Sequence, residues 1–195
     1  MAVKSNLKNM ALCLFITCFF CSAILAAVYA VTKDPIAQTN AAILKESVSA
    51  VLPEGGELSG PQPIEVGGVP SEYYTLAKDG KPVAYAVKSV VSGFGGPLEV
   101  MVGITADGVV HNTSVLSHTE TPGLGAKCNT DEKFMAQWKG FDTKNKILKV
   151  KKDGGDVDAI TASTITSRAY AAAVSNALAA VQGNVSAASG ASVQK

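Results

Sequence analysis

The feature that most constrains the fold is an uncharged stretch of 22 residues near the N-terminus, residues 10–31. A helix that crosses the hydrocarbon core of a bilayer needs about 20 residues, so this stretch predicts a single membrane-spanning helix. Lys4 and Lys8 precede it, and no basic excess follows it. Positive charge marks the cytoplasmic side, so residues 1–9 are expected in the cytoplasm and the chain from about Thr32 onward on the outer side.

A cleavable signal peptide is the alternative for this segment. The basic start and the small residues Ala26, Ala27 and Ala30 also fit that pattern. However, the uncharged run is longer than the roughly 7 to 15 residues of a signal-peptide core. Its length therefore favours an anchor that stays in the membrane.

The remaining sequence predicts an α+β fold, with one outer domain in which helices pack on an antiparallel sheet. Runs of β-branched and aromatic residues, separated by glycine-containing turns, predict consecutive hairpins. These runs are residues 73–76, 83–91, 98–104 and 109–116, with a further brief strand at 147–150. Apolar residues at steps of three and four predict helices at residues 36–52, 131–138 and 167–182.

The division of the chain follows from these segments. Glycine and proline between residues 54 and 70 predict a loop with at most a short strand. The Ala- and Ser-rich end predicts a disordered tail. We expect a cytoplasmic start at 1–9, the membrane helix at 10–31, a juxtamembrane helix and loop at 32–70, the main domain at 71–182 and a flexible tail at 183–195.

Charge and cysteine content exclude several classes of function. The 17 basic and 16 acidic residues are interspersed, so the basic stripe of a nucleic-acid-binding protein is missing. Three of the four cysteines lie in the uncharged run, which leaves Cys128 without a disulfide partner in the outer domain. His111 and His118 have no partners at metal-ligand spacing, so we expect no metal site.

A dense cluster of hydroxyl side chains precedes the last predicted helix. Five of the seven residues from 161 to 167 carry a hydroxyl: Thr161, Ser163, Thr164, Thr166 and Ser167. The first N–H groups of a helix lack partners and its dipole is positive there, which suits a phosphate group. A plain N-cap with spare hydroxyls explains the same residues, because Ser and Thr are common caps.

The segment Asp158-x-x-Thr161-Ala162-Ser163-Thr164 resembles the flavinylation motif of the FMN-binding domain family, Asp-x-x-Ser/Thr-Gly-Ala-Thr. The resemblance implies that FMN is attached to Thr164 through a phosphoester. It also implies that a separate flavin transferase makes the bond from FAD and reads Asp158 and Thr161. Ser163 and Thr166 remain alternative acceptors.

Two positions depart from the family pattern. Ala162 stands where glycine is common, and Ser163 stands where alanine is common. Only glycine adopts a positive φ cheaply, so Ala162 argues against a positive φ at this position.

Two glycine-containing loops carry the second part of the resemblance. The segment from residue 120 to 125 reads Glu-Thr-Pro-Gly-Leu-Gly, and the segment from 93 to 97 reads Gly-Phe-Gly-Gly-Pro. In the family the first lies close to the flavin, while small residues in the second let the ring approach the backbone. The resemblance therefore implies a cofactor site that includes Glu120, Thr121, Gly123, Leu124, Gly95 and Gly96. Taken alone, each loop also fits an ordinary turn between strands.

The order of anchor, loops and motif resembles the family of G subunits of Rnf-type electron-transport complexes. This implies a redox component of a bacterial cytoplasmic-membrane complex that couples ferredoxin and NAD chemistry to ion pumping. Its partners would be the neighbouring subunits, with no substrate site of its own. Three alternatives remain: a component like the C subunit of the sodium-translocating NADH:quinone reductase, a tethered flavoprotein of another redox chain, and an anchored binding domain without cofactor.

Overall fold

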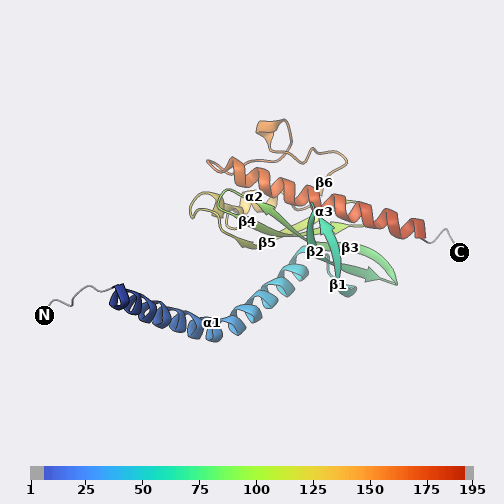
Figure 1. The fold of residues 1–195 in the computed structure, drawn as a ribbon. Coiled ribbons are helices and arrows are strands. Elements are labelled where there is room, and N and C mark those ends of the chain that lie inside the picture. The colour runs from blue at the N-terminus through green and yellow to red at the C-terminus, as the bar shows by residue number, and fades with distance from the viewer. Residues whose placement is uncertain (1–6, 192–195) are drawn as a thin grey trace. The chain divides into compact units, whose positions relative to one another are not determined.

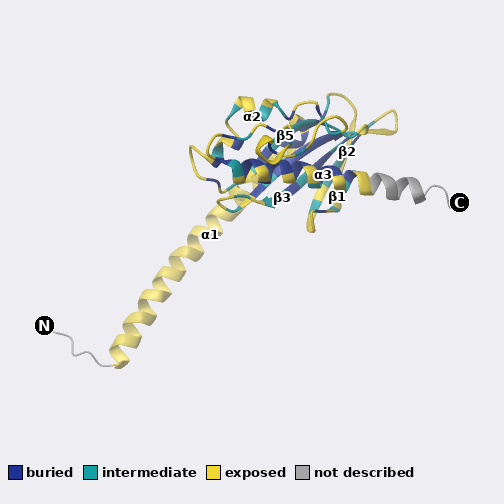
Figure 2. Cartoon of the chain, turned by 90° about the horizontal axis from the view of Figure 1, so that it is seen from above, coloured by how far each residue is buried: buried dark blue, intermediate teal, exposed yellow. Residues whose placement is uncertain are grey.

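The computed structural model describes residues 7–191 and, of the side chains, those of residues 7–183 (Figure 1). The contacts divide the chain into one unit up to Ile43 and a second from Leu44 onward. Helix α1, Leu7–Val51, contributes to both. In the first unit every described side chain is exposed, as the pale helix in Figure 2 shows.

The exposed part of α1 has the character of a membrane span. An 18-residue window within it reaches a mean hydropathy of 2.6, and it is the one such helix in the described part of the chain. Large apolar side chains cover it on all sides, among them Phe15, Phe19, Phe20 and Leu25. A helix that is apolar all round needs an apolar environment. The predicted membrane helix and juxtamembrane helix are thus continuous, with Pro35 inside the helix.

The last turns of α1 belong to the second unit and pack on the sheet. Val48, Val51 and Leu52 are buried in a small core with Leu76 and Met101. Two β5 side chains bind the carbonyl groups that end the helix: Asn112 Nδ2 donates to the Ala50 carbonyl at 2.9 Å, and His111 Nδ1 lies 3.0 Å from the Val51 carbonyl oxygen. These contacts satisfy acceptors that a helix C-terminus leaves unpaired.

The sheet is an antiparallel meander of six strands in sequence order. The strands are β1 Glu57–Val66, β2 Val69–Lys78, β3 Lys81–Ser92, β4 Pro97–Thr105, β5 Val109–His118 and β6 Phe141–Asp142. Strand β4 is buried on both faces, because Val100, Val102 and Ile104 face the main core while Met101 faces the end of α1. The predicted α+β fold with an antiparallel sheet is confirmed.

Helix α3, Thr164–Ala191, covers the main face of the sheet. Its small and branched side chains, such as Ala173, Val174 and Ala177, are fully buried in the core. An aromatic cluster closes one end of this core, with the Trp138 ring stacked on Tyr170 at 5.0 Å and Phe134 edge-on to Tyr170 at 5.2 Å.

The short helix α2, Glu132–Ala136, supplies part of this cluster. Asp131 caps it by accepting from the Phe134 N–H at 3.1 Å. Phe134 and Trp138 stand four residues apart and pack together in the core, with ring centroids 5.9 Å apart.

Several sequence predictions were wrong. Residues 54–70 are not a loop, because β1 and the start of β2 fill most of this range. Strand β1 is an edge strand, so it tolerates proline and lacks the apolar alternation that reveals a buried strand. Residues 147–150 contribute only an isolated bridge from Val150 to Val157, followed by a 3₁₀ helix at Lys151–Asp153.

The limits of α3 also differ from the prediction. The helix begins three residues before Ser167 and runs through Gly183 to Ala191, so most of the predicted tail is helical. Residues 192–195 of that tail lie outside the described residues.

The contact between α1 and β4 depends on Gly103. A Cβ atom at this position would lie 1.9 Å from the Val51 carbonyl oxygen. We expect Gly103→Ala to lower the free energy of unfolding by about 1–3 kcal/mol, because neither backbone can move freely. Denaturant unfolding in detergent, followed by fluorescence of the single buried Trp138, measures this. Gly183→Ala is the control: a Cβ there meets nothing within 4 Å, so stability should stay equal or rise. Equal stability of both variants would contradict the close approach.

Candidate functional site

A cavity of about 320 Å³ lies between the N-terminal turn of α3 and the loops that follow β3 and β5. Its wall is formed mainly by apolar side chains and hydroxyl groups. The lining residues are Phe94, Glu120, Thr121, Leu124, Gly125, Ala162, Ser163, Thr164, Ile165 and Thr166. The two glycine-containing loops and the hydroxyl cluster, far apart in sequence, therefore meet at one place.

The chain turns tightly into α3. The Ser163 N–H donates to the Ile160 carbonyl at 3.0 Å, and Ala162 between them has a φ of +61°. Ser167 holds this turn from inside the helix, because its hydroxyl accepts from the Ile160 N–H and donates to the Ser163 carbonyl, both at 2.9 Å. The expectation that residue 162 does not need a positive φ was wrong. Alanine adopts the left-handed conformation here at a cost that glycine avoids.

The five hydroxyls of the cluster differ sharply in access. Ser167 is fully buried, and Thr166 is buried with its hydroxyl donating to Glu120. The Ser163 hydroxyl is buried without a hydrogen-bond partner. Thr161 is exposed but does not line the cavity. Thr164, half-buried at the first position of α3, is thus the one hydroxyl of the five that both lines the cavity and reaches solvent.

Glu120 ties the three segments of the site together. Its side chain is 6% exposed; Oε1 accepts from the Phe94 N–H at 2.8 Å, and Oε2 accepts from the Thr166 hydroxyl at 2.9 Å. A buried carboxylate is costly unless donors surround it, and here the donors come from the loop after β3 and from α3. The carboxylate thereby fixes both segments relative to the loop after β5.

The loop after β5 is a tight turn. The Leu124 N–H donates to the Thr121 carbonyl at 3.1 Å, with Pro122 and Gly123 at the corner and a φ of +77° at Gly123. Proline followed by a glycine with positive φ is typical of a type II turn. The turn places Thr121 and Leu124 in the cavity wall. Gly123 provides the positive φ that the turn requires and does not line the cavity.

The glycines of the loop after β3 allow this loop to pack closely against the loop after β5. A Cβ at Gly95 would lie 2.1 Å from the Thr119 carbonyl oxygen, and one at Gly96 would lie 2.4 Å from the Thr119 hydroxyl. At Gly93 the Cβ would lie 2.0 Å from Glu120 Oε1. Neither Gly95 nor Gly96 lines the cavity. The small residues thus let the two loops close around Glu120.

Comparison with known proteins matches residues 93–179 to the FMN-binding domain family. The G subunit of the proton-translocating ferredoxin:NAD(+) oxidoreductase complex of Clostridium ljungdahlii is 36% identical over 168 residues, which are 85% of this chain and 86% of that protein. The chain belongs to the family of G subunits of these ion-translocating complexes. A further relative is the G subunit of the ion-translocating oxidoreductase complex of Shewanella amazonensis, 34% identical over 93% of this chain and 90% of that one.

Among solved structures, that of Shewanella oneidensis NqrC is similar over 54% of each chain, with a TM-score of 0.43 and 26% identity.

The matched FMN-binding region includes the whole cavity. Of the residues that the motif resemblance pointed to, Thr164, Ser163, Glu120, Thr121 and Leu124 line it. Asp158, Thr161, Gly123, Gly95 and Gly96 do not. Phe94, Ala162, Ile165 and Gly125 line it without having been expected as site residues, although each stands inside or beside a recognised motif.

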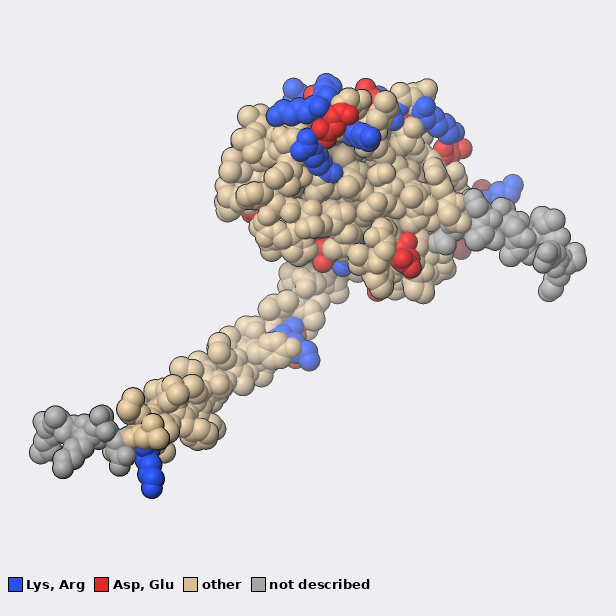
Figure 3. Space-filling view, turned by 45° about the horizontal axis from the view of Figure 1, so that its top comes forward, with Lys and Arg blue, Asp and Glu red and all other residues tan. Residues whose placement is uncertain are grey.

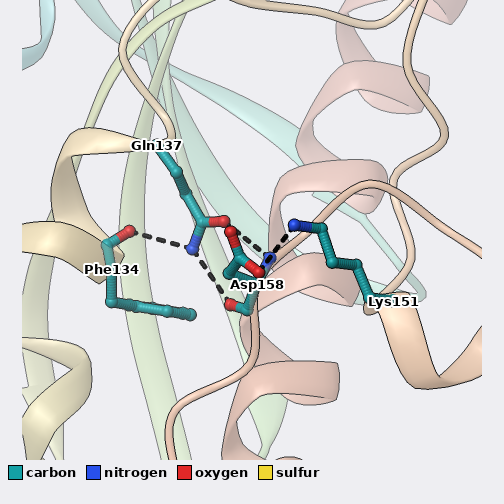
Figure 4. A network of polar contacts seen from close by, with 4 residues as sticks. All are labelled: Phe134, Gln137, Lys151 and Asp158. Carbon is teal, nitrogen blue, oxygen red and sulfur yellow. Dashed lines mark hydrogen bonds and ion pairs between the residues drawn. The ribbon is translucent and has the colours of Figure 1, made fainter.

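Asp158 stands at the start of the family motif, and its backbone is held firmly while its side chain is exposed. Figure 4 shows Gln137 bridging the Asp158 backbone: Oε1 accepts from the Asp158 N–H at 2.8 Å, and Nε2 donates to the Asp158 carbonyl at 3.1 Å. The same Nε2 donates to the Phe134 carbonyl at 3.1 Å. A hydrogen bond from Lys151, 2.8 Å away, lowers the pKa of the Asp158 carboxyl. The carboxylate is therefore charged and accessible to another protein.

Cys128 ends the 3₁₀ helix Gly125–Cys128, which follows the turn after β5, and is fully buried. Burial, with the Glu120 carboxylate as a smaller cause, raises the pKa of its thiol to about 11. Such a thiol is protonated and unreactive at neutral pH, as expected of a structural cysteine.

The positive φ at Ala162 gives a direct test of the turn. Ala162→Gly should raise the free energy of unfolding by roughly 0.5–1 kcal/mol, because removal of the left-handed strain outweighs the added chain entropy. Ala172→Gly is the matched control: it lies exposed in α3 and should lower stability by about 1 kcal/mol. Denaturant unfolding in detergent measures both. A loss of stability in Ala162→Gly equal to that of the control would refute the turn.

Proposed function

We propose that this protein carries electrons within a membrane-bound, ion-translocating ferredoxin:NAD oxidoreductase complex through an FMN bound covalently to Thr164. Family membership supports the redox role and the cofactor. The observation that carries the attachment site is the access of Thr164, the one hydroxyl of the cluster that lines the cavity and reaches solvent.

The attachment is a phosphoryl transfer. A separate flavin transferase brings FAD, the Thr164 oxygen forms a bond to the phosphorus on the FMN side, and the bond from that phosphorus to AMP breaks. AMP leaves, and the hydroxyl proton passes to the transferase or to water. The exposed Asp158 and Thr161 are the motif positions that the transferase recognises. Ser163 and Thr166 are poor acceptors, because a second enzyme has little access to their buried hydroxyls.

The residues of the cavity fit a flavin. Phe94, Leu124 and Ile165 offer apolar surface and are 67%, 44% and 51% exposed, so a flat ring would cover surface that water now meets. The buried Ser163 hydroxyl in the wall lacks a hydrogen-bond partner, which is the kind of polar atom that a ligand satisfies. When bound, FMN supplies electron transfer in single steps.

The chain's own residues orient the cofactor rather than react with a substrate. Glu120 keeps the loop with Phe94 and the start of α3 at a fixed separation, so the apolar wall and the attachment point hold their relative positions. The first N–H groups of α3 favour the negative phosphate at Thr164. We infer that neighbouring subunits deliver and remove the electrons, without a substrate site in this chain.

We also propose that the domain lies on the outer side of the bacterial cytoplasmic membrane. Lys4 and Lys8 precede the span, and no comparable basic cluster follows it. The positive-inside rule then leaves the N-terminus in the cytoplasm and retains α1 as a single anchor.

The attachment site is tested by variants produced together with the transferase. Thr164→Ala should abolish in-gel flavin fluorescence after denaturation, because the acceptor oxygen is gone. Thr164→Ser should keep partial labelling, since only a methyl group is lost. Ser163→Ala is the matched control and should keep covalent labelling, because it removes a hydroxyl near the cofactor but leaves the acceptor oxygen of Thr164 in place. Undiminished labelling of Thr164→Ala, or loss of labelling in Ser163→Ala, would overturn the assignment.

The topology is tested with protease added to intact spheroplasts. The domain after Thr32 should be digested, while a tag placed before residue 8 should stay protected. Detergent-permeabilised cells serve as the control, in which both are digested. Protection of the domain in intact spheroplasts would reverse the proposed orientation.

A further inference from the structure

One positively charged side chain lies next to the Thr164 hydroxyl oxygen, the proposed attachment atom. The Lys152 amine donates to the Thr164 hydroxyl oxygen at 3.3 Å, although the two residues are 12 positions apart. Lys152 is the middle residue of the 3₁₀ helix Lys151–Asp153, in a stretch of basic and acidic side chains. Figure 3 shows such side chains gathered on one face of the domain. In the sequence, the closely spaced lysines at positions 144, 146, 149, 151 and 152 predict only a solvated surface.

The backbone beneath Lys152 is held on both sides. The Lys151 N–H donates to the Val157 carbonyl at 2.9 Å, and the Gly155 N–H donates to the Val150 carbonyl at 3.2 Å. A Cβ at Gly155 would lie 2.1 Å from the Lys149 carbonyl oxygen, so the two backbone segments of the turn leave no room for a side chain between them. Lys152 is thus presented from a fixed turn toward the start of α3.

Two neighbouring cations, Lys151 and Arg168, are already paired with carboxylates. Lys151 Nζ lies 2.8 Å from Asp158 Oδ1. Arg168 binds Asp153 with two hydrogen bonds of 2.6 and 2.7 Å, which lower the pKa of the Asp153 carboxyl. Among the described residues, Lys152 forms no ion pair, and its amine faces a neutral hydroxyl instead.

We propose that Lys152 is a positioning residue for the phosphate of the flavin. This inference rests on the proposed attachment to Thr164. The phosphorus is bonded directly to the Thr164 oxygen, so a non-bridging phosphate oxygen comes within reach of an amine only 3.3 Å from that atom. The phosphodiester carries one negative charge, which the ammonium group neutralises through a charge-assisted hydrogen bond.

The same contact acts during attachment. While the bond from Thr164 to phosphorus forms and the bond from phosphorus to AMP breaks, negative charge builds on the phosphate oxygens. A fixed ammonium group beside them stabilises that charge. Lys152 takes no proton in this step, because an ammonium group has only donors.

The first test measures the rate of labelling of the full chain in detergent, with purified transferase and FAD. Lys152→Met should label about tenfold more slowly, as expected for the loss of one hydrogen bond between charged groups. Lys152→Arg should restore most of the rate, and Lys152→Glu should be slower than Lys152→Met. Lys149→Met is the matched control: this exposed lysine stands three residues earlier in the same stretch, and its variant should label at the wild-type rate.

The second test uses protein that is already labelled, without the transferase. Time-resolved fluorescence anisotropy should show faster local rotation of the flavin in Lys152→Met than in the wild type, and wild-type behaviour in Lys149→Met. Slower labelling with unchanged anisotropy would mean that Lys152 acts only in docking of the transferase, which overturns the proposal.

The two proposals fail in distinguishable ways. A wild-type chain without covalent flavin would refute the attachment itself. A labelled wild type, with Lys152→Met equal to it in both labelling rate and anisotropy, would refute only the role of Lys152.

Discussion

The site depends on one buried carboxylate. Glu120 accepts from the Phe94 N–H and from the Thr166 hydroxyl, so it joins the loop after β3, the loop after β5 and the start of α3. Burial makes both bonds necessary, because an unpaired charge at this depth costs far more than a hydrogen bond returns. The glycines at 93 and 125 leave the space that its two oxygens occupy. The buried Glu120 carboxylate therefore determines how the segments of the cavity wall are arranged, more than the residues of the flavin motif do.

The rest of the domain supplies a rigid frame for this contact. The core beneath α3 and the aromatic cluster around Tyr170 fix the helix on the sheet, and the Tyr170 hydroxyl donates to Thr113 at 2.8 Å inside that core. On the opposite face, the last turns of α1 pack against β4. Strand β4 at the centre of the sheet is thus buried between α3 and the end of α1. Electron carriers gain from such a frame, since fixed surroundings keep the cofactor in one position.

The sequence predicted the parts of the structure that depend on local pattern. The long uncharged run, the four runs of β-branched and aromatic residues and the helical spacing of residues 131–138 are all local signals, and the fold class followed from them. Strand β1 was missed because an edge strand with prolines carries no such signal. The positive φ at Ala162 was missed because the residue type argued against it, and only the geometry of the turn requires it.

The density of hydroxyl residues located the cluster before α3, and motif resemblance pointed to Glu120; the structure brings both to one cavity. The resemblance also assigned Gly95 and Gly96 to the cofactor site, and in the structure both glycines lie against Thr119. Lys152 had no sequence signal at all, because a turn between residues 150 and 157 brings it to Thr164.

The central claim is that FMN is esterified to Thr164, and the most direct measurement is tandem mass spectrometry of the protein purified from its own membrane. Trypsin cleaves after Lys152 and Arg168, so the tryptic peptide 153–168 contains the entire hydroxyl cluster. The account predicts that this peptide carries the mass of FMN less water and that the fragment ions place it on Thr164. A wholly unmodified peptide, or an adduct located on Thr161, Ser163, Thr166 or Ser167, would contradict the account.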